Sequence, residues 1–422
     1  MKLLKRQGYG ITVNENNIAD FAFVLFLCNI LLGAIFRNAL AVIGMARFYH
    51  LFSICIIYIP VLVLCIISPR KYIKIDFLIL WISVILFLGI TLLVHPEYEY
   101  WYARETYGVW DYVLRFDNDL YIYLFIRLVN DPKRILRNFK ISSWIMYLYL
   151  GNQYYTAMKV GYWIQVRSDG TQIHSPYNLA FGYNVLSFAL VFLYYALKEK
   201  KIIDWVAFGV GMLMIFIAGS RGPLLCVLLF LFFYFLTVFK ESNIGRKSIY
   251  VIAFIVIAIL VWVSYSNILN VIANLLDEFN ISSRSFRMLI SGNISDDNNR
   301  LPIWNAAINM IKDHPLGYGA MGTRHVIGNI IIMGHPHNFI LEIFIDYGVI
   351  LGLLLLVCLI CGICTNIFSK EREDWRGIFL IFFGRALQLF ISGTYWHNIG
   401  FMGCIAVGVC SYIDASRNKR RY

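Results

Sequence analysis

Charged residues are scarce in this chain: Asp, Glu, Lys and Arg make up only 15% of its 422 residues. A soluble globular domain carries about 25%, so the composition excludes that class. Hydrophobic residues reach 59% instead, and apolar runs long enough to cross roughly 30 Å of hydrocarbon recur along the chain. In lipid such runs must be helical, because the backbone has to satisfy its own hydrogen bonds. The alternating ten-residue segments of a membrane β-barrel are missing, so we predict an all-α polytopic membrane protein.

Cysteine is also sparse, and all nine cysteines fall within predicted spans, which argues against a disulfide framework. The spacing of Cys358, Cys361 and Cys364 imitates a set of metal ligands. Within an apolar helix, however, small polarizable packing residues are the better interpretation. A cleavable signal is missing too, since residues 1–17 are basic and then polar. We therefore expect the first span to act as an uncleaved anchor.

About twelve membrane-spanning helices are predicted, with a large external loop between the ninth and the tenth. The spans are expected near residues 18–36, 51–67, 75–94, 118–129, 141–158, 176–197, 202–218, 223–239, 248–266, 347–368, 376–392 and 397–413. The larger share of the 37 lysines and arginines then lies on the side of both termini, which predicts cytoplasmic termini. All eight histidines fall on the external side. The net charge of +12 is spread over short loops, so nucleic acid is not an expected partner.

The whole chain, residues 1–422, is predicted to form a single membrane domain without internal repeats or linkers. Residues 267–336 form an external insertion that is too long for a bare connection in a compact protein. Within it, residues 302–312 have helical periodicity, and Gly317 and Gly319 follow as signals that end a helix. We expect this insertion to fold as a cap over the external face.

Residues 219–223, with the sequence Gly-Ser-Arg-Gly-Pro, separate two apolar runs on the predicted external side. The glycines and the proline break the helix and expose backbone N–H groups, and Pro223 suits the first turn of the next helix. A guanidinium from Arg221 beside such amides would make a good phosphate site. The alternative is a short turn with one arginine that reaches the membrane surface.

A second group of polar candidates lies in the insertion or directly after it: Arg300, Arg324, His335 and His337. Arginines at a membrane surface are commonly solvated or bound to lipid headgroups, and that interpretation stays open for each one. His337 differs because it opens the next helix, followed by Asn338 and an apolar run. A neutral imidazole held there can take a proton from a hydroxyl near pH 7. A capping or interfacial role is the alternative.

Two acidic pairs, Asp117-x-Asp119 and Asp296-Asp297, could in principle hold a divalent cation. A helix N-cap at Asp119 and a solvated turn at Asp296 explain them better, so we predict no metal site. Arg127 and Arg385 fall inside predicted spans, where charge usually marks function. Arg127 lies near a span end and can reach the surface, whereas Arg385 in mid-span predicts a polar cavity near it.

Taken in order, these motifs resemble the O-antigen ligase and polymerase superfamily. The order is Gly219-Ser220-Arg221-Gly222, Arg300-x3-Trp304, His314-Pro315-Leu316-Gly317-x-Gly319, and His337-Asn338 with Gly348 beyond. The motifs cover roughly residues 219–356, and helix count and loop placement extend the resemblance to the whole chain. Family members often have a second glycine three residues after the one that matches Gly348, but Leu351 stands there in this chain.

The resemblance implies a lipid-dependent glycosyltransferase of GT-C-like, many-helix architecture. Its donor would be an undecaprenyl-diphosphate-linked oligosaccharide, and no cofactor is implied. Arg221 and Arg300 would neutralise the diphosphate leaving group without a metal, with Arg324 as a further candidate. His337 would be the general base on the acceptor hydroxyl, as the family's matching histidine is thought to be. The implied substrate-binding residues are Asn338, His335, Arg324 and Ser220.

The expected function is polymerisation of lipid-linked repeat units into O-antigen or capsule, on the external face of the bacterial inner membrane. The expected partners are the lipid-linked donor and acceptor, membrane lipids and, where chain length is controlled, a regulator protein. Aromatic-rich loops before residue 176 favour a polymerase over a ligase that moves finished glycan to lipid A-core. A flippase or transporter of the same lipid is a third alternative, but it would be expected to show paired halves.

Overall fold

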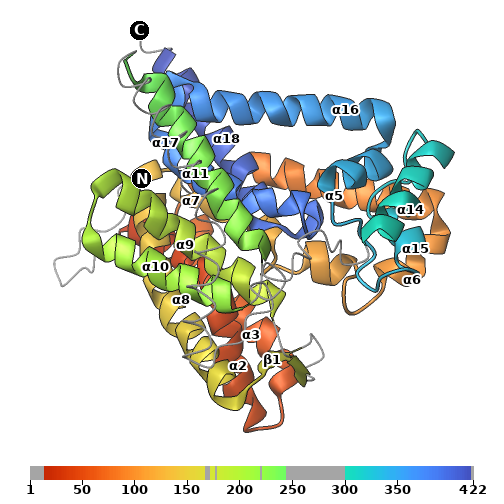
Figure 1. Ribbon diagram of the computed structural model, residues 1–422, viewed down its shortest axis with the longest axis horizontal. Helices are drawn as coiled ribbons and strands as arrows, with labels where there is room; N and C mark the ends of the chain where they lie inside the picture. The colour runs from red at the N-terminus through yellow and green to blue at the C-terminus, as the bar shows by residue number, and fades with distance from the viewer. Residues whose placement is uncertain (1–13, 167–171, 176–177, 219–220, 244–299, 420–422) are drawn as a thin grey trace, which may run out of the picture.

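The computed structural model describes residues 14–166, 172–175, 178–218, 221–243 and 300–419. These residues are almost wholly helical, which confirms the all-α membrane class (Figure 1). The helices are α1 (Glu15–Leu27), α2 (Asn29–Ala41), α3 (Tyr49–Ile67), α4 (Pro69–Tyr72), α5 (Ile75–Val94), α6 (Glu99–Tyr102), α7 (Ile122–Val129), α8 (Pro132–Val160), α9 (Leu179–Glu199), α10 (Ile202–Ile217), α11 (Arg221–Glu241), α14 (Arg300–Asp313), α15 (Thr323–Ile327), α16 (Phe339–Phe368), α17 (Glu373–Ala386) and α18 (Ile399–Lys419). Two antiparallel strands, β1 (Trp163–Val166) and β2 (Gln172–Ser175), form a hairpin after α8.

Six helices in the described part of the chain are long and apolar enough to cross a membrane, and the α1–α2 pair, bent by 71°, would be a seventh span. The six are Ala46–Ile67, Ile75–Val94, Ala180–Glu199, Arg221–Glu241, Phe339–Phe368 and Ile399–Lys419. A multi-pass membrane protein is therefore confirmed, while the count of twelve stays a prediction. The span expected near 248–266 lies outside the described residues, and the segments near 118–129 and 376–392 contain the shorter helices α7 and α17.

Helices α7 and α17 are too short to span a membrane and are buried by other helices instead. Helix α7 packs against α1 and α18, and nearly all of its side chains are buried, Arg127 among them. The expectation that Arg127 reaches the membrane surface is therefore wrong: its Nε donates to Oδ2 of Asp76 at 2.6 Å. Burying a guanidinium is costly unless its charge is paired, and Asp76 in the first turn of α5 provides the pair.

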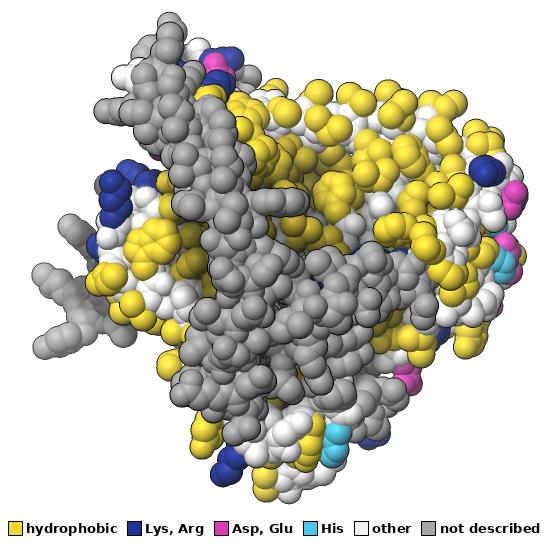
Figure 2. Space-filling view, viewed as in Figure 1, with side chains coloured by type: hydrophobic (Ala, Val, Ile, Leu, Met, Phe, Trp, Pro, Cys, Tyr) yellow, Lys and Arg dark blue, Asp and Glu magenta, His cyan; other side chains and the backbone are white. Residues whose placement is uncertain are grey.

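Helix α16 is broken at Gly348, whose φ of 77° and ψ of 173° are not helical. Residues 339–347 form a short arm, and residues 349–368 form the long straight helix of Figure 1. The long arm exposes large apolar side chains such as Ile350 and Ile360, and it borders the hydrophobic surface of Figure 2. Contact with lipid explains such exposure. The break thus places a short polar arm at one end of a lipid-facing helix.

The helix expected at residues 302–312 is confirmed as α14, which ends at Asp313 before the predicted glycines. Gly317 and Gly319 both adopt positive φ, of 97° and 81°. Residues 267–299 of the predicted insertion lie outside the described residues. Figure 1 shows α14, α15 and α6 gathered at one end of the protein, beside the end of α5 and the short arm of α16.

Candidate functional site

The frame of the candidate site is a backbone contact between the Gly317 turn and the break in α16. The N–H of Val349 donates to the carbonyl of Pro315 at 2.8 Å, and the N–H of Tyr318 donates to the carbonyl of Ile345 at 2.7 Å. A Cβ on Gly348 would lie 2.5 Å from the carbonyl carbon and oxygen of Leu316. The two glycine motifs, distant in sequence, are therefore two sides of one contact, and they hold the start of α16 against α14.

The segment that leads into α16 is attached to α14 by Trp304. Its indole Nε1 donates to the carbonyl of Pro336 at 3.0 Å. Arg300 lies one turn before Trp304 on the same helix, and side chains four residues apart share a helix face. Arg300 is close enough to His337 to lower the pKa of that histidine. The motif Arg300-x3-Trp304 thus places one cation and one anchor beside the two histidines.

His337 is partly buried and has a positive φ of 54°. Its Nδ1 accepts a hydrogen bond from the backbone N–H of Gly393 at 3.4 Å. Burial, together with the charge of Arg300, lowers the pKa of His337 to about 4, so the imidazole is neutral at pH 7. The next residue, Asn338, caps α16: its Oδ1 accepts from the N–H groups of Ile340 at 3.0 Å and Leu341 at 3.3 Å.

His335 packs against His337, with ring centroids 4.5 Å apart, and is only 2% exposed. Its Nδ1 lies 3.3 Å from the carbonyl oxygen of Met333. Its Nε2 is buried and has no hydrogen-bond partner among the described residues. Burial, followed by electrostatic interactions with His337 and Arg324, holds the pKa of His335 well below its usual value. Both histidines are therefore neutral.

Arg324 on α15 is 1% exposed, and two of its contacts come from the loop of residues 95–117. Its Nε donates to the carbonyl of Tyr107 at 3.2 Å, and its guanidinium carbon lies 5.3 Å from the Tyr112 ring centroid. Both terminal nitrogens, Nη1 and Nη2, are buried without a hydrogen-bond partner in the described part of the chain. Glu342 and Asp346 lie within electrostatic range of this guanidinium, but neither bonds to its terminal nitrogens, so both nitrogens can donate to a ligand oxygen.

Two buried acidic side chains on the short arm of α16 were not among the candidates from the sequence. Glu342 accepts from Oγ1 of Thr394 at 2.5 Å and from the N–H of Tyr395 at 3.4 Å. Asp346 accepts from the Tyr395 hydroxyl at 2.5 Å and from Nε1 of Trp396 at 2.9 Å. These two side chains therefore fix the turn whose Gly393 N–H reaches His337. Their signal in the sequence is two acidic residues four apart in an apolar run.

Arg221 begins α11, while the neighbouring candidate Ser220 lies outside the described residues. A Cβ on Gly222 would lie 1.8 Å from the Tyr183 hydroxyl, so the Tyr183 ring packs directly on the first turn of α11. Tyr183 also lies within electrostatic range of Arg300 and Arg385. Arg300 of α14 and Arg385 of α17 thus lie near the tyrosine that packs on the start of α11.

Arg385 lies against an aromatic ring and a hydroxyl, and the polar cavity expected near it stays a prediction. Its guanidinium carbon lies 5.3 Å from the Tyr183 ring centroid, and its Nε donates to Oγ of Ser187 at 3.1 Å. Its Nη1 is buried and has no hydrogen-bond partner within the described ranges.

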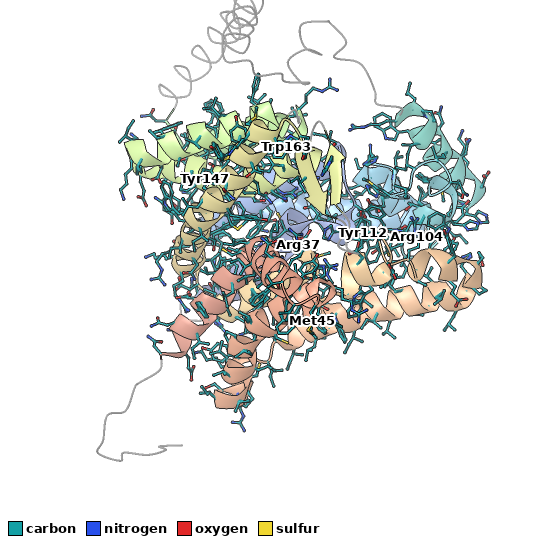
Figure 3. The ribbon with its side chains drawn as sticks, turned by 90° about the horizontal axis from the view of Figure 1, so that it is seen from below. Arg37, Met45, Arg104, Tyr112, Tyr147 and Trp163 are labelled. Carbon is teal, nitrogen blue, oxygen red and sulfur yellow. The ribbon has the colours of Figure 1, made fainter. Side chains whose placement is uncertain are left out.

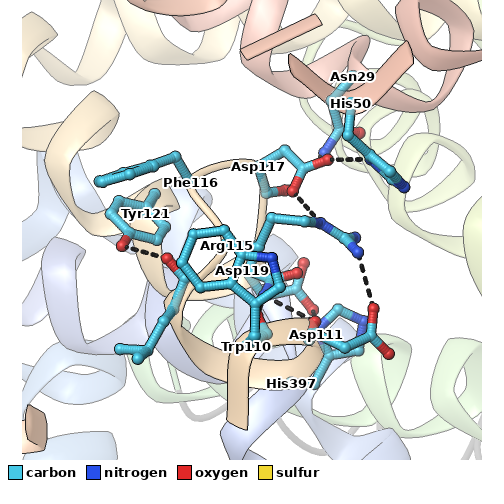
Figure 4. Close-up of polar contacts among 12 residues, drawn as sticks. Asn29, His50, Trp110, Asp111, Arg115, Phe116, Asp117, Asp119, Tyr121 and His397 are labelled. Carbon is cyan, nitrogen blue, oxygen red and sulfur yellow. Dashed lines mark hydrogen bonds and ion pairs between the residues drawn. The ribbon is translucent and has the colours of Figure 1, made fainter. Parts of the chain in front are cut away.

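The loop of residues 95–117 is tied to the rest of the protein by the polar cluster shown in Figure 4. Asp117 pairs with Nδ1 of His50 at 3.0 Å and with Nε of Arg115 at 2.5 Å. Asp119 was expected to cap a helix, but its Oδ2 lies 3.6 Å from Nδ1 of His397 instead. These contacts occupy the acidic pair considered above as a cation site. No group of metal-binding residues occurs in the described part of the chain.

The same loop reaches the candidate site itself. Figure 3 labels Arg104 and Tyr112, which lie between α5 and the α14–α15 region. Arg104 donates to the carbonyl of Ile332 at 3.2 Å, and Tyr112 stacks on His397 with ring centroids 5.1 Å apart. The arrangement therefore combines arginines able to bind phosphate oxygens, two neutral histidines and an aromatic loop beside Arg324.

Comparisons with known proteins match part of this chain to a recognised family. Residues 206–357 match the family described as O-antigen ligase. The chain is also 29% identical over 123 residues to a Rickettsia conorii protein whose name describes it as a polysaccharide ligase. That match covers 26% of this chain and spans 29% of the length of the relative. Both findings confirm the resemblance to the O-antigen ligase and polymerase superfamily. The family match spans Arg221, Arg300, Arg324 and both histidines.

Proposed function

Because residues 206–357 match the O-antigen ligase family, we propose that this protein is a glycosyltransferase that uses a lipid-linked diphosphate glycan as donor. The observation that carries this proposal is the buried Arg324, whose terminal nitrogens lack a partner in the described residues, beside two neutral histidines. A diphosphate leaving group requires fixed positive charge as the glycosidic bond breaks. Arg221 and Arg300 would supply more of it, since a guanidinium binds phosphate oxygens in a bidentate manner.

In the proposed reaction, a hydroxyl of the acceptor sugar attacks the anomeric carbon of the donor. The bond to the diphosphate breaks in the same displacement, which would invert the anomeric centre. Asn338 holds the start of α16, and with it the position of His337 at the reacting centre. The polyprenyl tail would lie along the exposed apolar surface beside α16 (Figure 2). The enzyme would work at the external face of the bacterial inner membrane, with both termini cytoplasmic.

Within this class we favour a polymerase of undecaprenyl-diphosphate-linked repeat units, which build O-antigen or capsule. The loop of residues 95–117 supports this choice, because Tyr107 and Tyr112 contact Arg324 and would lie next to the sugars of a bound repeat unit. A ligase that transfers finished glycan to lipid A-core is the second candidate, favoured by the family description and the name of the relative. A chain-length regulator protein would be a partner of the polymerase only.

The deciding experiment is a gel of surface glycan from a strain that lacks the gene. Collapse of the ladder to core plus a single repeat would support the polymerase. Loss of all glycan from the core, with long lipid-linked chains accumulating, would establish the ligase. An unchanged gel, with lipid-linked precursor turned over normally, would reject both.

Arg221→Lys is expected to lower transfer about tenfold or more in membranes from the complemented strain. Lysine keeps the charge but presents a point donor instead of a planar fork, so the bidentate contact with phosphate is lost. The exposed Arg70 offers a matched control, because Arg70→Lys should leave transfer unchanged. Equal activity of both variants would show that the start of α11 is only a structural turn.

Trp304→Phe is expected to lower transfer several-fold while the protein inserts normally. The substitution keeps an aromatic ring but removes the N–H that donates to Pro336, a loss of about 0.5–1.5 kcal/mol. His337 is then held less firmly. Trp205→Phe, at an exposed position on α10, is the control. Full activity of the Trp304 variant, measured with purified lipid-linked donor, would exclude the anchoring role.

A further inference from the structure

The hydrogen bond at His337 determines which ring nitrogen carries the proton. A backbone N–H can only donate, so Nδ1 of His337 accepts from Gly393 and is itself unprotonated. A neutral imidazole has one protonated nitrogen. The proton of His337 therefore lies on Nε2, and that nitrogen is a hydrogen-bond donor rather than a base.

His335 has the opposite arrangement. A carbonyl oxygen can only accept, so Nδ1 of His335, 3.3 Å from the Met333 oxygen, carries the proton. Its Nε2 then holds a free lone pair, and that atom is the one buried without a partner among the described residues. The two rings lie 4.5 Å apart, so a donor nitrogen and an acceptor nitrogen belong to one site.

The backbone around each ring supports these tautomers. Gly334, with a φ of 67°, turns the chain so that His335 faces back towards Met333. A Cβ on Gly334 would lie 2.8 Å from Cγ of Arg324, so the same turn brings Arg324 close. On the other side, Glu342 holds Thr394 and Tyr395, which fixes the preceding Gly393 N–H towards His337.

We propose that His335, not His337, accepts the proton of the acceptor hydroxyl, and that His337 donates a hydrogen bond through Nε2–H to the leaving diphosphate. This assignment rests on the proposed glycosyl transfer and differs from the expectation that His337 is the general base. Glu342 and Thr394 are then positioning residues, since they act on His337 through the Gly393 turn.

The proposed step balances in atoms and charge. The acceptor oxygen bonds to the anomeric carbon while the bond from that carbon to the diphosphate oxygen breaks, and its electron pair leaves with the diphosphate. The hydroxyl proton passes to Nε2 of His335, which later returns it to water. In the free protein, burial lowers the pKa of His335 most, and electrostatic interactions with His337 and Arg324 lower it further. Diphosphate bound to Nη1 and Nη2 of Arg324 would cancel that cation and make His335 a stronger base.

Nitrogen-15 NMR of histidine-labelled protein in lipid nanodiscs at pH 7 tests the tautomers without any substrate. The signals of His335 and His337 are assigned among the eight histidines by their loss in His335→Asn and His337→Asn. We expect a protonated Nδ1 at His335 and a protonated Nε2 at His337. The same tautomer at both residues, or the reverse pair, would overturn the assignment.

Glutamine variants test the roles with lipid-linked glycan isolated from the deletion strain. The amide N–H of His337→Gln can replace an Nε2–H donor, so transfer should fall about tenfold. His335→Gln has no base and should lose about a hundredfold or more. His174→Gln, on the β-hairpin, is the control. The reverse order of losses would overturn the roles, and a wild-type protein without transfer would overturn the proposed function instead, whatever the tautomers.

Discussion

His337→Ala is expected to reduce glycan transfer by about a hundredfold to a thousandfold, the loss typical of one removed donor to a developing negative charge. The substitution takes away both ring nitrogens, so it removes the contact to Gly393 as well as the contact proposed to the diphosphate. The fold should persist, because Asn338 still caps α16 and the Gly317 turn still contacts Gly348.

The measurement is the surface-glycan gel of a deletion strain that expresses the variant, with membrane insertion checked by immunoblot. His174→Ala, at an exposed position on β2, serves as the matched control. A normal ladder from His337→Ala would remove this residue from the mechanism, under either histidine assignment.

Gly348→Ala is expected to inactivate the protein by disrupting the fold around the site. The combination of a φ of 77° and a ψ of 173° is essentially restricted to glycine, and the conformational strain alone costs about 1–3 kcal/mol. The new methyl group would also lie 2.5 Å from backbone atoms of Leu316, which cannot move aside as a flexible side chain can. The Gly317 turn would separate from α16, and both histidines would lose the backbone contact that positions them.

Gly362→Ala is the matched control for this prediction, since it lies on the long arm of the same helix and a Cβ there has no neighbour within 4 Å. The thermal unfolding temperature in detergent and the transfer activity should both be lower for Gly348→Ala than for the wild type. Neither should be lower for Gly362→Ala. If the two variants unfold at the same temperature, the break at Gly348 does not carry the site.

The polar residues of the site could be predicted because they interrupt apolar sequence, where any charged or turn-forming residue stands out. Arg300, the helix that follows it, the glycines and the two histidines were found in this way. The burial of Arg324 could not be predicted, because Tyr107 and Tyr112 come from a loop more than two hundred residues earlier. A local pattern carries no information about such distant partners.

Glu342 and Asp346 were missed for a different reason. The tenth span was predicted to start at residue 347, and the apolar run on both sides of Gly348 gives no periodic sign of a break. A similar limit applies to α8, whose polar residues look unsuitable for a protein interior. Asp20 of α1 accepts from Arg134 at 2.9 Å and from Asn138 at 2.6 Å, and such pairing across helices is invisible to hydropathy.

The break in α16 also links the site to the thickness of the bilayer. Residues 349–368 make a helix about 30 Å long, which is close to the hydrocarbon thickness of a typical bilayer. In thinner lipid this arm must tilt to avoid hydrophobic mismatch, and the histidine segment at its end would move with it. We therefore expect transfer in reconstituted vesicles to peak at one acyl-chain length; equal rates in thin and thick bilayers would show that the short arm moves independently of the long one.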